Sequence, residues 1–161
     1  MTKIFHISKN PQVTIHVKIN PSGLYSAHLS HSTNGNGFVC HIEGEGAIKI
    51  EEALLDWLKA YSKGKNIKLP PYLLGNLPQF TQTVLNQLIE IPFGKTITYQ
   101  DLAESVGSVK GARAAGGACG RNPLLLFVPC HRVIRSSGEL GGFSEGLDYK
   151  KLLLDFECAL S

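Results

Sequence analysis

The spacing of hydrophobic residues changes along this chain, from a strand-like period near the start to a helical period afterwards. Residues 13–19 alternate apolar with polar side chains, as a half-buried strand does. Residues 20–23 combine proline and glycine in a turn, so residues 24–29 are expected to return as the second strand of a hairpin. Residues 38–42 predict a further strand. The apolar residues of 47–61 recur at helical spacing, which predicts an amphipathic helix.

The second half of the chain favours short helices. The apolar spacing predicts a helix over about residues 78–90. Thr98 can cap the next helix, and Asp101 three residues on suits the positive end of that helix. Another helix is expected to begin near Ala112 and to end at residues 120–123. Two short helices separated by a glycine-containing turn are typical of a helix-turn-helix, although a plain helical hairpin gives the same pattern.

These patterns together predict a chain in two parts. The first is an α/β N-terminal domain over residues 1–72, which consists of a small antiparallel sheet plus a helix. The second is an all-helical C-terminal domain over residues 76–161, which contains the helix-turn-helix. Residues 65–71 end in two prolines and are expected to link the two domains.

One cysteine has the surroundings of a nucleophile. Five apolar residues and a proline, residues 124–129, lead directly to Cys130, and His131 and Arg132 follow it. The apolar run is expected to be buried and the proline to fix the next turn, so that the thiol lies at the edge of a rigid core. Neighbouring positive groups favour the thiolate, which is the attacking form. Free cysteines are also often inert buried residues, and the local sequence alone favours neither interpretation.

The helix expected after Ala112 consists almost entirely of alanine and glycine, with Arg113 as its single long side chain. Such a helix can approach another surface closely, for example the DNA minor groove, which is only about 6 Å wide. Close packing against a second helix explains the same composition. Six basic and two acidic residues lie from Lys95 to Arg135, a distribution that suits either a polyanion or an ordinary solvated surface.

The composition is that of an ordinary globular protein. The 161 residues are 43% hydrophobic and 18% charged, which excludes a disordered chain. No apolar stretch approaches the ~18 residues of a membrane span, and the N-terminus lacks a secretory signal. The four cysteines lie without a disulfide framework, as reduced thiols do. We therefore expect the protein in the cytoplasm, or in the nucleus of a eukaryote, with no membrane as its partner.

Three segments resemble one known family. The signature of the O6-alkylguanine-DNA alkyltransferases is closely similar to GARAAGGACGRNP at residues 111–123 and to PCHRV at residues 129–133. The family's entry into its DNA-binding helices is similar to IPFGKTITY at residues 91–99. The resemblance runs from about Phe80 to Glu157 without obvious gaps. It implies a DNA repair protein that moves a methyl or other alkyl group from O6 of guanine, and from O4 of thymine, irreversibly to its own cysteine.

The same resemblance implies the catalytic residues. Cys130 would be the nucleophile and alkyl acceptor, and His131 would act as general base through a bridging water. Glu157 falls on the carboxylate that orients this histidine, and Asn122 on the asparagine that braces the turn before the cysteine. Tyr99 matches the tyrosine whose hydroxyl donates to N3 of the flipped guanine. No cofactor is implied.

The resemblance also implies how DNA is bound. The partner would be double-stranded DNA carrying O6-alkylguanine, bound by a monomer. Arg113 would fill the stack that the flipped base vacates, and Arg121 would meet phosphate. The small residues of the same helix would allow its backbone into the minor groove: Ala112, Ala114 and Gly116.

Two further residues are implied to contact the flipped base itself. Ser144 matches a residue that contacts O6 of the guanine. The backbone at Cys130 and at Val133 would accept hydrogen bonds from the exocyclic amine of the base.

This chain also departs from the family pattern. Glu145 replaces a glycine common in relatives, beside the expected pocket, where a carboxylate could repel DNA or narrow the entrance for bulky adducts. Cys119 stands where relatives often have a larger residue. Some relatives bind zinc in the N-terminal half, but Cys40 and His41 form the only suggestive pair, and no metal is predicted.

Two alternative functions remain open. One is a lesion-binding module that keeps the fold but whose thiol, behind Glu145, reacts poorly. The other is a cysteine hydrolase that uses Cys130 and His131 on a small acyl or amide substrate, without DNA.

Overall fold

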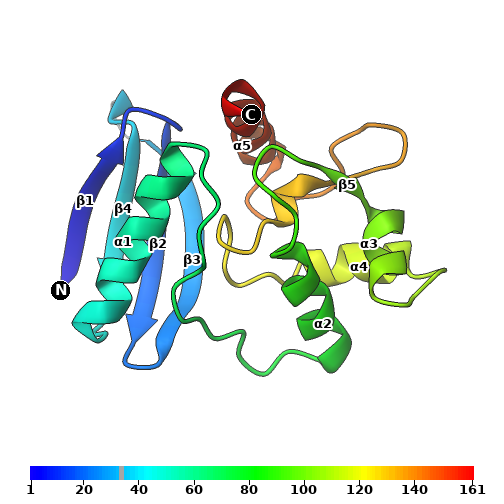
Figure 1. Ribbon diagram of the computed structural model, residues 1–161, viewed down its shortest axis with the longest axis horizontal. Helices are drawn as coiled ribbons and strands as arrows, with labels where there is room; N and C mark the ends of the chain where they lie inside the picture. Colours follow the sequence, from blue (N-terminus) through cyan, green and yellow to red (C-terminus); the bar gives the residue numbers. More distant parts are fainter. Residues whose placement is uncertain (33–34) are drawn as a thin grey trace.

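The N-terminal part of the computed structural model is a four-stranded sheet covered on one face by a helix. The structure describes residues 1–32 and 35–161. The helix is α1 (Ile48–Ser62), which lies across the sheet in Figure 1 and confirms the helix predicted over 47–61. The strands are β1 (Thr2–Ser8), β2 (Val13–Asn20), β3 (Gly23–His31) and β4 (Phe38–Glu43).

The prediction of an antiparallel sheet is correct for two of the pairings and wrong for one. The strands lie in the order β1-β4-β2-β3, with β1 antiparallel to β4 and β2 antiparallel to β3. β2 and β4 are parallel, with His16 opposite His41. After β3 the chain passes to the far side of β2, so β4 runs there in the same direction as β2. Hydrophobic alternation shows which side chains are buried, but it does not show which strands become neighbours.

The buried face of the sheet follows the alternation of β2. Val13, Ile15, Val17 and Ile19 are all at most 2% exposed. Full burial of each such side chain stabilises the fold by about 1.5–3 kcal/mol. The opposing face of α1 supplies the other side of this core with Ile50, Leu54, Trp57, Leu58 and Tyr61.

The C-terminal part is mainly helical, but the prediction of an all-helical domain is wrong in one detail. β5 (Ile97–Thr98) pairs in parallel with β6 (Val133–Ile134), and a single 3-10 turn, η2 (Cys130–Arg132), precedes β6. A two-residue strand is too short to produce a hydrophobic period, so the sequence carries no signal for it. The helices are α2 (Gln79–Leu88), α3 (Tyr99–Ser105), α4 (Ala112–Cys119) and α5 (Leu147–Leu160).

The start of α3 is fixed by a capping box. Thr98 Oγ1 accepts from the backbone N–H of Asp101, and the Asp101 carboxylate accepts from the backbone N–H of Thr98, both at 3.0 Å. This confirms the predicted cap, and it places Tyr99 as the first helical residue. Residues 106–111 then lead to α4, which packs against α2 and α3 through the buried Ala115 and Ala118.

The two parts share contacts along β3, which is the edge strand on the side of the C-terminal helices (Figure 1). Ala27 N–H donates to Pro123 O at 2.9 Å, and Leu125 N–H donates to Ala27 O at 3.2 Å. A single hydrophobic core contains buried residues from both parts, including Trp57 and Phe127, whose rings lie 4.6 Å apart. The division at residues 72–76 stays a prediction.

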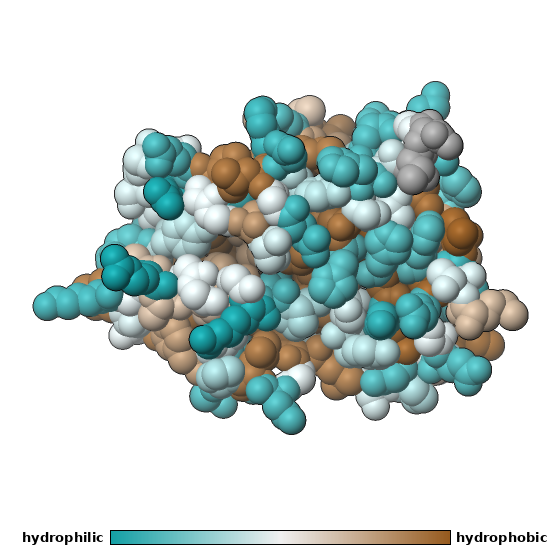
Figure 2. Space-filling model, turned by 180° about the vertical axis from the view of Figure 1, so that it is seen from behind, coloured by the Kyte–Doolittle hydropathy of each residue, from teal (hydrophilic) through white to brown (hydrophobic). Residues whose placement is uncertain are grey.

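The helices and one face of the surface show how the hydrophobic residues are distributed. Across the described residues, no helix has both the length and the hydrophobicity that crossing a membrane requires. On the face drawn in Figure 2, hydrophilic residues cover most of the surface and hydrophobic residues appear in separate patches.

Candidate active site

Cys130 lies at the end of a buried, tightly turned segment, as the apolar run predicts. All residues from Leu124 to Val128 are buried. Leu126 has a φ of 77°, a left-handed conformation that a leucine rarely adopts and that costs about 1–3 kcal/mol. The surrounding core therefore holds this segment in one conformation. Cys130 begins η2 and is only 5% exposed.

Asn122 braces the segment before Cys130 through its side chain. Its Nδ2 donates to Val128 O at 2.7 Å and to Cys130 Sγ at 3.3 Å, while its Oδ1 accepts from Leu124 N–H at 2.9 Å. One buried amide thus fixes both ends of the turn and one side of the thiol. An N–H donor on sulfur favours the thiolate over the thiol.

The electrostatic surroundings of Cys130 differ from what the sequence suggests. Burial raises the pKa of the thiol, and the Asn122 hydrogen bond and the Lys150 ammonium act against that rise. Arg132, although only two residues away, turns its guanidinium to Glu157 and to the carbonyl of Ile91. The expectation that Arg132 lowers the thiol pKa is therefore wrong, because side chains on successive residues of a 3-10 turn point in different directions.

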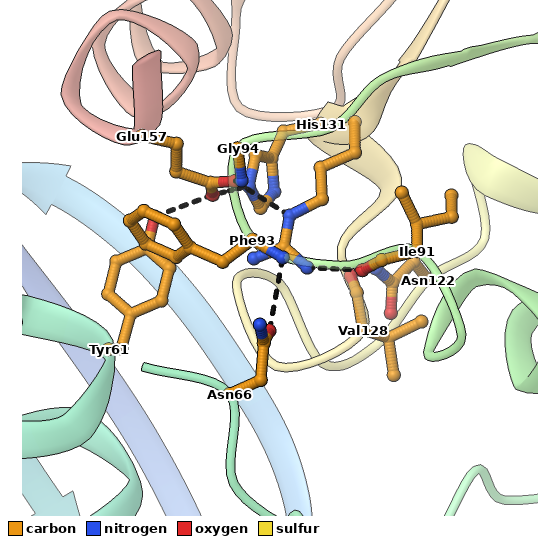
Figure 3. Close-up of polar contacts among 10 residues, drawn as sticks. Tyr61, Asn66, Ile91, Phe93, Gly94, Asn122, Val128, His131 and Glu157 are labelled. Carbon is orange, nitrogen blue, oxygen red and sulfur yellow. Dashed lines mark hydrogen bonds and ion pairs between the residues drawn. The ribbon is translucent and has the colours of Figure 1, made fainter. Parts of the chain in front are cut away.

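Glu157 of α5 is the centre of a buried hydrogen-bond network (Figure 3). Its Oε2 accepts from Tyr61 OH at 2.8 Å and from His131 Nε2. Its Oε1 accepts from Arg132 Nε at 2.7 Å and from the backbone N–H of Gly94 at 3.1 Å. Burial alone raises the pKa of a carboxyl, but the bonds from His131 and the charge of Arg132 hold the pKa of Glu157 at about 2. The carboxylate is therefore ionised at neutral pH and fully hydrogen-bonded.

His131 is completely buried and is held as a neutral imidazole. Burial lowers its pKa below the ordinary 6.5, and the opposing effect of Glu157 does not restore it. The bond to Glu157 assigns the proton to Nε2, so Nδ1 carries the lone pair. Nδ1 is buried and has no hydrogen-bond partner among the residues that the structure describes. A neutral histidine with a free, buried acceptor nitrogen can take a proton.

A cavity of about 640 Å³ opens above the thiol. Six of the predicted site residues line it: Tyr99, Ala112, Arg113, Gly116, Cys130 and Ser144. Cys119, Arg135, Gly141, Gly142 and Phe143 also line the cavity. Three predicted catalytic residues are buried but are not among its lining residues: Asn122, His131 and Glu157. The structure thus brings α3, α4, η2 and the segment before α5 around one space.

Three further predicted site residues also lie outside the lining of this cavity. Val133 is buried and belongs to the β5–β6 pairing, opposite Ile97. Ala114 is exposed on α4. Arg121 is also exposed, and its Nη1 lies 3.5 Å from Thr81 Oγ1 on α2, which is at the limit of a hydrogen bond.

Lys150 is a site residue that the sequence reasoning missed. It is fully buried on α5, and its Nζ donates to Gly142 O at 3.1 Å and reaches Tyr99 OH at 3.4 Å. Burial lowers the pKa of Lys150 below its ordinary value. The nearby Cys130 and Cys119 sulfurs oppose this shift but do not reverse it. The signal was present in the helical spacing, because Lys150, Leu153 and Glu157 fall on one face of α5.

Tyr99 is fixed against two glycines. A Cβ on Gly141, whose φ is 74°, would lie 2.7 Å from the Tyr99 hydroxyl, and a Cβ on Gly116 would lie 3.6 Å from the Tyr99 ring. Burial raises the pKa of Tyr99, so the phenol keeps its proton at neutral pH. The distance at Gly116 is an ordinary van der Waals contact, so an alanine would fit beside Tyr99 and packing does not require the glycine.

The departure at position 145 does not narrow the cavity. Glu145 is not among the lining residues, and its Oε1 lies 3.1 Å from His28 Nδ1 on β3.

The described part of the chain contains no group of three or more histidine, cysteine or acidic side chains placed to hold a metal ion.

Comparison with known proteins identifies the family. A family model described as the DNA-binding domain of 6-O-methylguanine DNA methyltransferase matches residues 79–159. A methylated-DNA–protein-cysteine methyltransferase of Methanosarcina acetivorans is 43% identical over 139 residues, which are 80% of this chain and 89% of the relative. A probable methylated-DNA–protein-cysteine methyltransferase of Acanthamoeba polyphaga mimivirus is 43% identical over 113 residues, 68% of this chain and 74% of its own length.

The fold agrees with that of a solved structure, Mycobacterium tuberculosis OGT in complex with DNA. The match has a TM-score of 0.69 and 28% identity, and it covers 92% of this chain and 94% of the other. The chain belongs to the methylated-DNA–protein-cysteine methyltransferase family, as its three sequence motifs predict.

Proposed function

We propose that this protein repairs DNA by transferring an alkyl group from O6 of guanine, and from O4 of thymine, to Cys130, once per molecule. The observation that carries the proposal is a thiol at the floor of a cavity, next to a neutral buried histidine and below the helix that would meet DNA. The names of the relatives describe the transfer of a methyl group from methylated DNA to a protein cysteine. The resulting thioether is chemically stable, so we expect the protein to stay alkylated and inactive after one transfer.

The proposed proton path begins at the thiol. Cys130 gives its proton through a water to Nδ1 of His131, the buried nitrogen whose lone pair is free. The Glu157 carboxylate stabilises the resulting imidazolium through the bond at Nε2. Asn122 steadies the developing thiolate with its N–H at 3.3 Å. The thiolate then attacks the alkyl carbon in line, so that a carbon–sulfur bond forms while the bond to O6 breaks.

As the bond to the alkyl group breaks, the departing guanine must gain a proton to leave as a neutral base. Tyr99 would donate its hydroxyl proton to N3, which makes guanine a neutral leaving group. Lys150 donates toward the Tyr99 oxygen, so the hydroxyl proton stays available for the base and the ammonium stabilises the phenolate left behind. Ser144 would contact O6, and the backbone at Cys130 and Val133 would accept from the exocyclic amine.

DNA would be bound by α3 and α4 as a helix-turn-helix. α4 would enter the minor groove, with the exposed Ala114 and the cavity-lining Ala112 on the side that meets DNA. Arg113 would replace the flipped base in the stack. Arg121 would bind phosphate on the outer surface, away from the cavity.

The protein would act as a monomer on double-stranded DNA, in the cytoplasm or in the nucleus of a eukaryote. Residues 1–72 would form a structural domain, and residues 76–161 would carry DNA binding and alkyl transfer.

A transfer assay on DNA tests the function directly. Increasing amounts of duplex containing O6-methylguanine are mixed with a fixed amount of protein, and the unmodified guanine formed in the DNA is counted. We expect formation to stop at one guanine per protein molecule. Continued turnover contradicts the proposal. A gel shift without guanine formation would instead identify a lesion-binding module, and activity on small acyl substrates alone would identify a hydrolase.

Replacement of Arg113 tests base flipping. The variant Arg113→Ala is expected to slow transfer from duplex DNA by about 10-fold to 100-fold, because extruding a base costs a few kcal/mol that the arginine helps to offset. Transfer from the free O6-alkylguanine base should be unchanged, since that base needs no extrusion. Rates with both substrates are compared by single-turnover kinetics. An equal loss with duplex and free base would show that Arg113 does not act on flipping.

A further inference from the structure

The edge strand β3 contacts two segments of the candidate active site, the one that leads to Cys130 and the one that follows Ser144. On one side the backbone of Ala27 bonds to Pro123 and Leu125, which lead to Cys130. On the other side His28 reaches Glu145, 117 residues away in sequence, with 3.1 Å between His28 Nδ1 and Glu145 Oε1. An N-terminal strand thus contacts the segment that follows the cavity-lining Ser144.

A second histidine of β3 contacts the same region. The rings of His31 and Tyr149 stack at 4.7 Å with an angle of 30° between their planes. Tyr149 immediately precedes the buried Lys150 at the start of α5. Two side chains on one strand therefore act together on the stretch from residue 145 to residue 149.

Glu145 is poorly placed for a protein that binds a polyanion. Its neighbour Ser144 lines the cavity together with the cations Arg113 and Arg135. A carboxylate released from His28 could turn toward this rim and repel the phosphate backbone. In the structure it does not, because its side chain lies against β3 and is 27% exposed.

We propose that His28 is a positioning residue that holds the Glu145 carboxylate on the N-terminal sheet and away from the DNA-binding rim. DNA affinity would then depend on a residue of the N-terminal domain that never touches DNA. The inference rests on the proposed function only in requiring that the rim of the cavity binds DNA. It does not depend on alkyl transfer.

A pair of substitutions tests this positioning role. His28→Ala is expected to weaken binding of an undamaged duplex oligonucleotide by about 3-fold at low salt, because the freed carboxylate repels phosphate over roughly 10–30 Å. Glu145→Gln should bind at least as tightly as the unmodified protein. The double variant His28→Ala, Glu145→Gln should regain that affinity. The difference between His28→Ala and the double variant should shrink as salt is added.

The matched control is His16→Ala. His16 lies directly opposite His28 on β2 and contacts Ser30 and His41 rather than Glu145, so its removal should leave DNA affinity unchanged. Affinity is measured by fluorescence anisotropy, with thermal unfolding to compare the fold of each variant. An unchanged affinity in His28→Ala overturns the proposal. So does a double variant that stays as weak as His28→Ala, because His28 would then act through the fold alone. Failure of alkyl transfer in the unmodified protein would leave these comparisons intact.

Discussion

Replacement of Cys130 with serine is expected to abolish alkyl transfer while DNA binding persists. The serine oxygen can still accept from Asn122 and fits the space of the sulfur, so the turn should keep its shape. A hydroxyl, however, is a far weaker nucleophile than a thiolate at neutral pH. We expect a loss of at least about 1,000-fold in the single-turnover rate, as for other nucleophile substitutions. Measurement needs a duplex with O6-methylguanine for the rate and an undamaged duplex for affinity.

The control for this experiment is the second thiol that lines the cavity. Burial raises the pKa of Cys119 to about 12, so it remains a neutral thiol under the assay conditions. Cys119→Ser should therefore retain transfer to Cys130. Transfer that survives in Cys130→Ser, or disappears in Cys119→Ser, would mean that the wrong sulfur has been assigned.

Replacement of Glu157 with glutamine is expected to destabilise the fold more than any surface substitution. Its carboxylate accepts from four donors, carried by Tyr61, His131, Arg132 and Gly94. The amide of glutamine would turn an N–H₂ toward some of these donors and leave the Arg132 guanidinium buried without its counter-charge. Breaking a buried ion pair from one side costs about 3–5 kcal/mol. The unfolding midpoint should fall by roughly 10 °C.

Thermal and urea unfolding measure this effect, and Glu139→Gln is its control. Glu139 pairs with Arg135 at 3.5 Å, but both side chains are largely exposed, so its replacement should leave the midpoint unchanged. Equal stability of Glu157→Gln and the unmodified protein would show that the buried network does not hold the parts of the site together.

The pH dependence of stability tests the same network. The Glu157 pKa is about 2 in the fold against an ordinary 4.5, so its contribution is fully present above pH 4.5 and is lost as pH falls toward 2. The His131 pKa is lowered from 6.5, so the unfolded chain takes up that proton first and stability also falls below pH 6.5. Both groups weaken the fold on acidification. The gap between the unmodified protein and Glu157→Gln should narrow below pH 4.5.

The sequence predicted local structure well because local structure depends on near neighbours. The α1 helix, the hairpin of β2 and β3 and the Thr98 cap each follow from residues a few positions apart. The parallel pairing of β2 with β4 could not be predicted from such local patterns, because it depends on which strand, distant in sequence, lies beside β2 in the sheet. The strands β5 and β6 have two residues each, which is too short for a hydrophobic alternation that could predict them.

For the candidate site too, the sequence predicted which residues take part but not the directions of their side chains. The motifs pointed to Cys130, His131 and Tyr99, and the structure places Cys130 and Tyr99 around one cavity, with His131 buried and hydrogen-bonded to Glu157. The side-chain directions were not predictable. Arg132 follows the thiol in sequence but faces Glu157, and Lys150 lies 20 positions away but reaches Tyr99. Such contacts are decided by tertiary packing, which a pattern of neighbouring residues does not contain.

The central claim is that Cys130 accepts the alkyl group, and the mass of the intact protein tests it most directly. The unmodified protein is exposed to an excess of duplex containing O6-methylguanine, weighed, and then digested to locate the modification. We predict a gain of one methyl group per molecule, found on the peptide that contains Cys130 and absent from those of Cys40, Cys119 and Cys158. No gain in mass, or a methyl group on any other residue, would contradict the account.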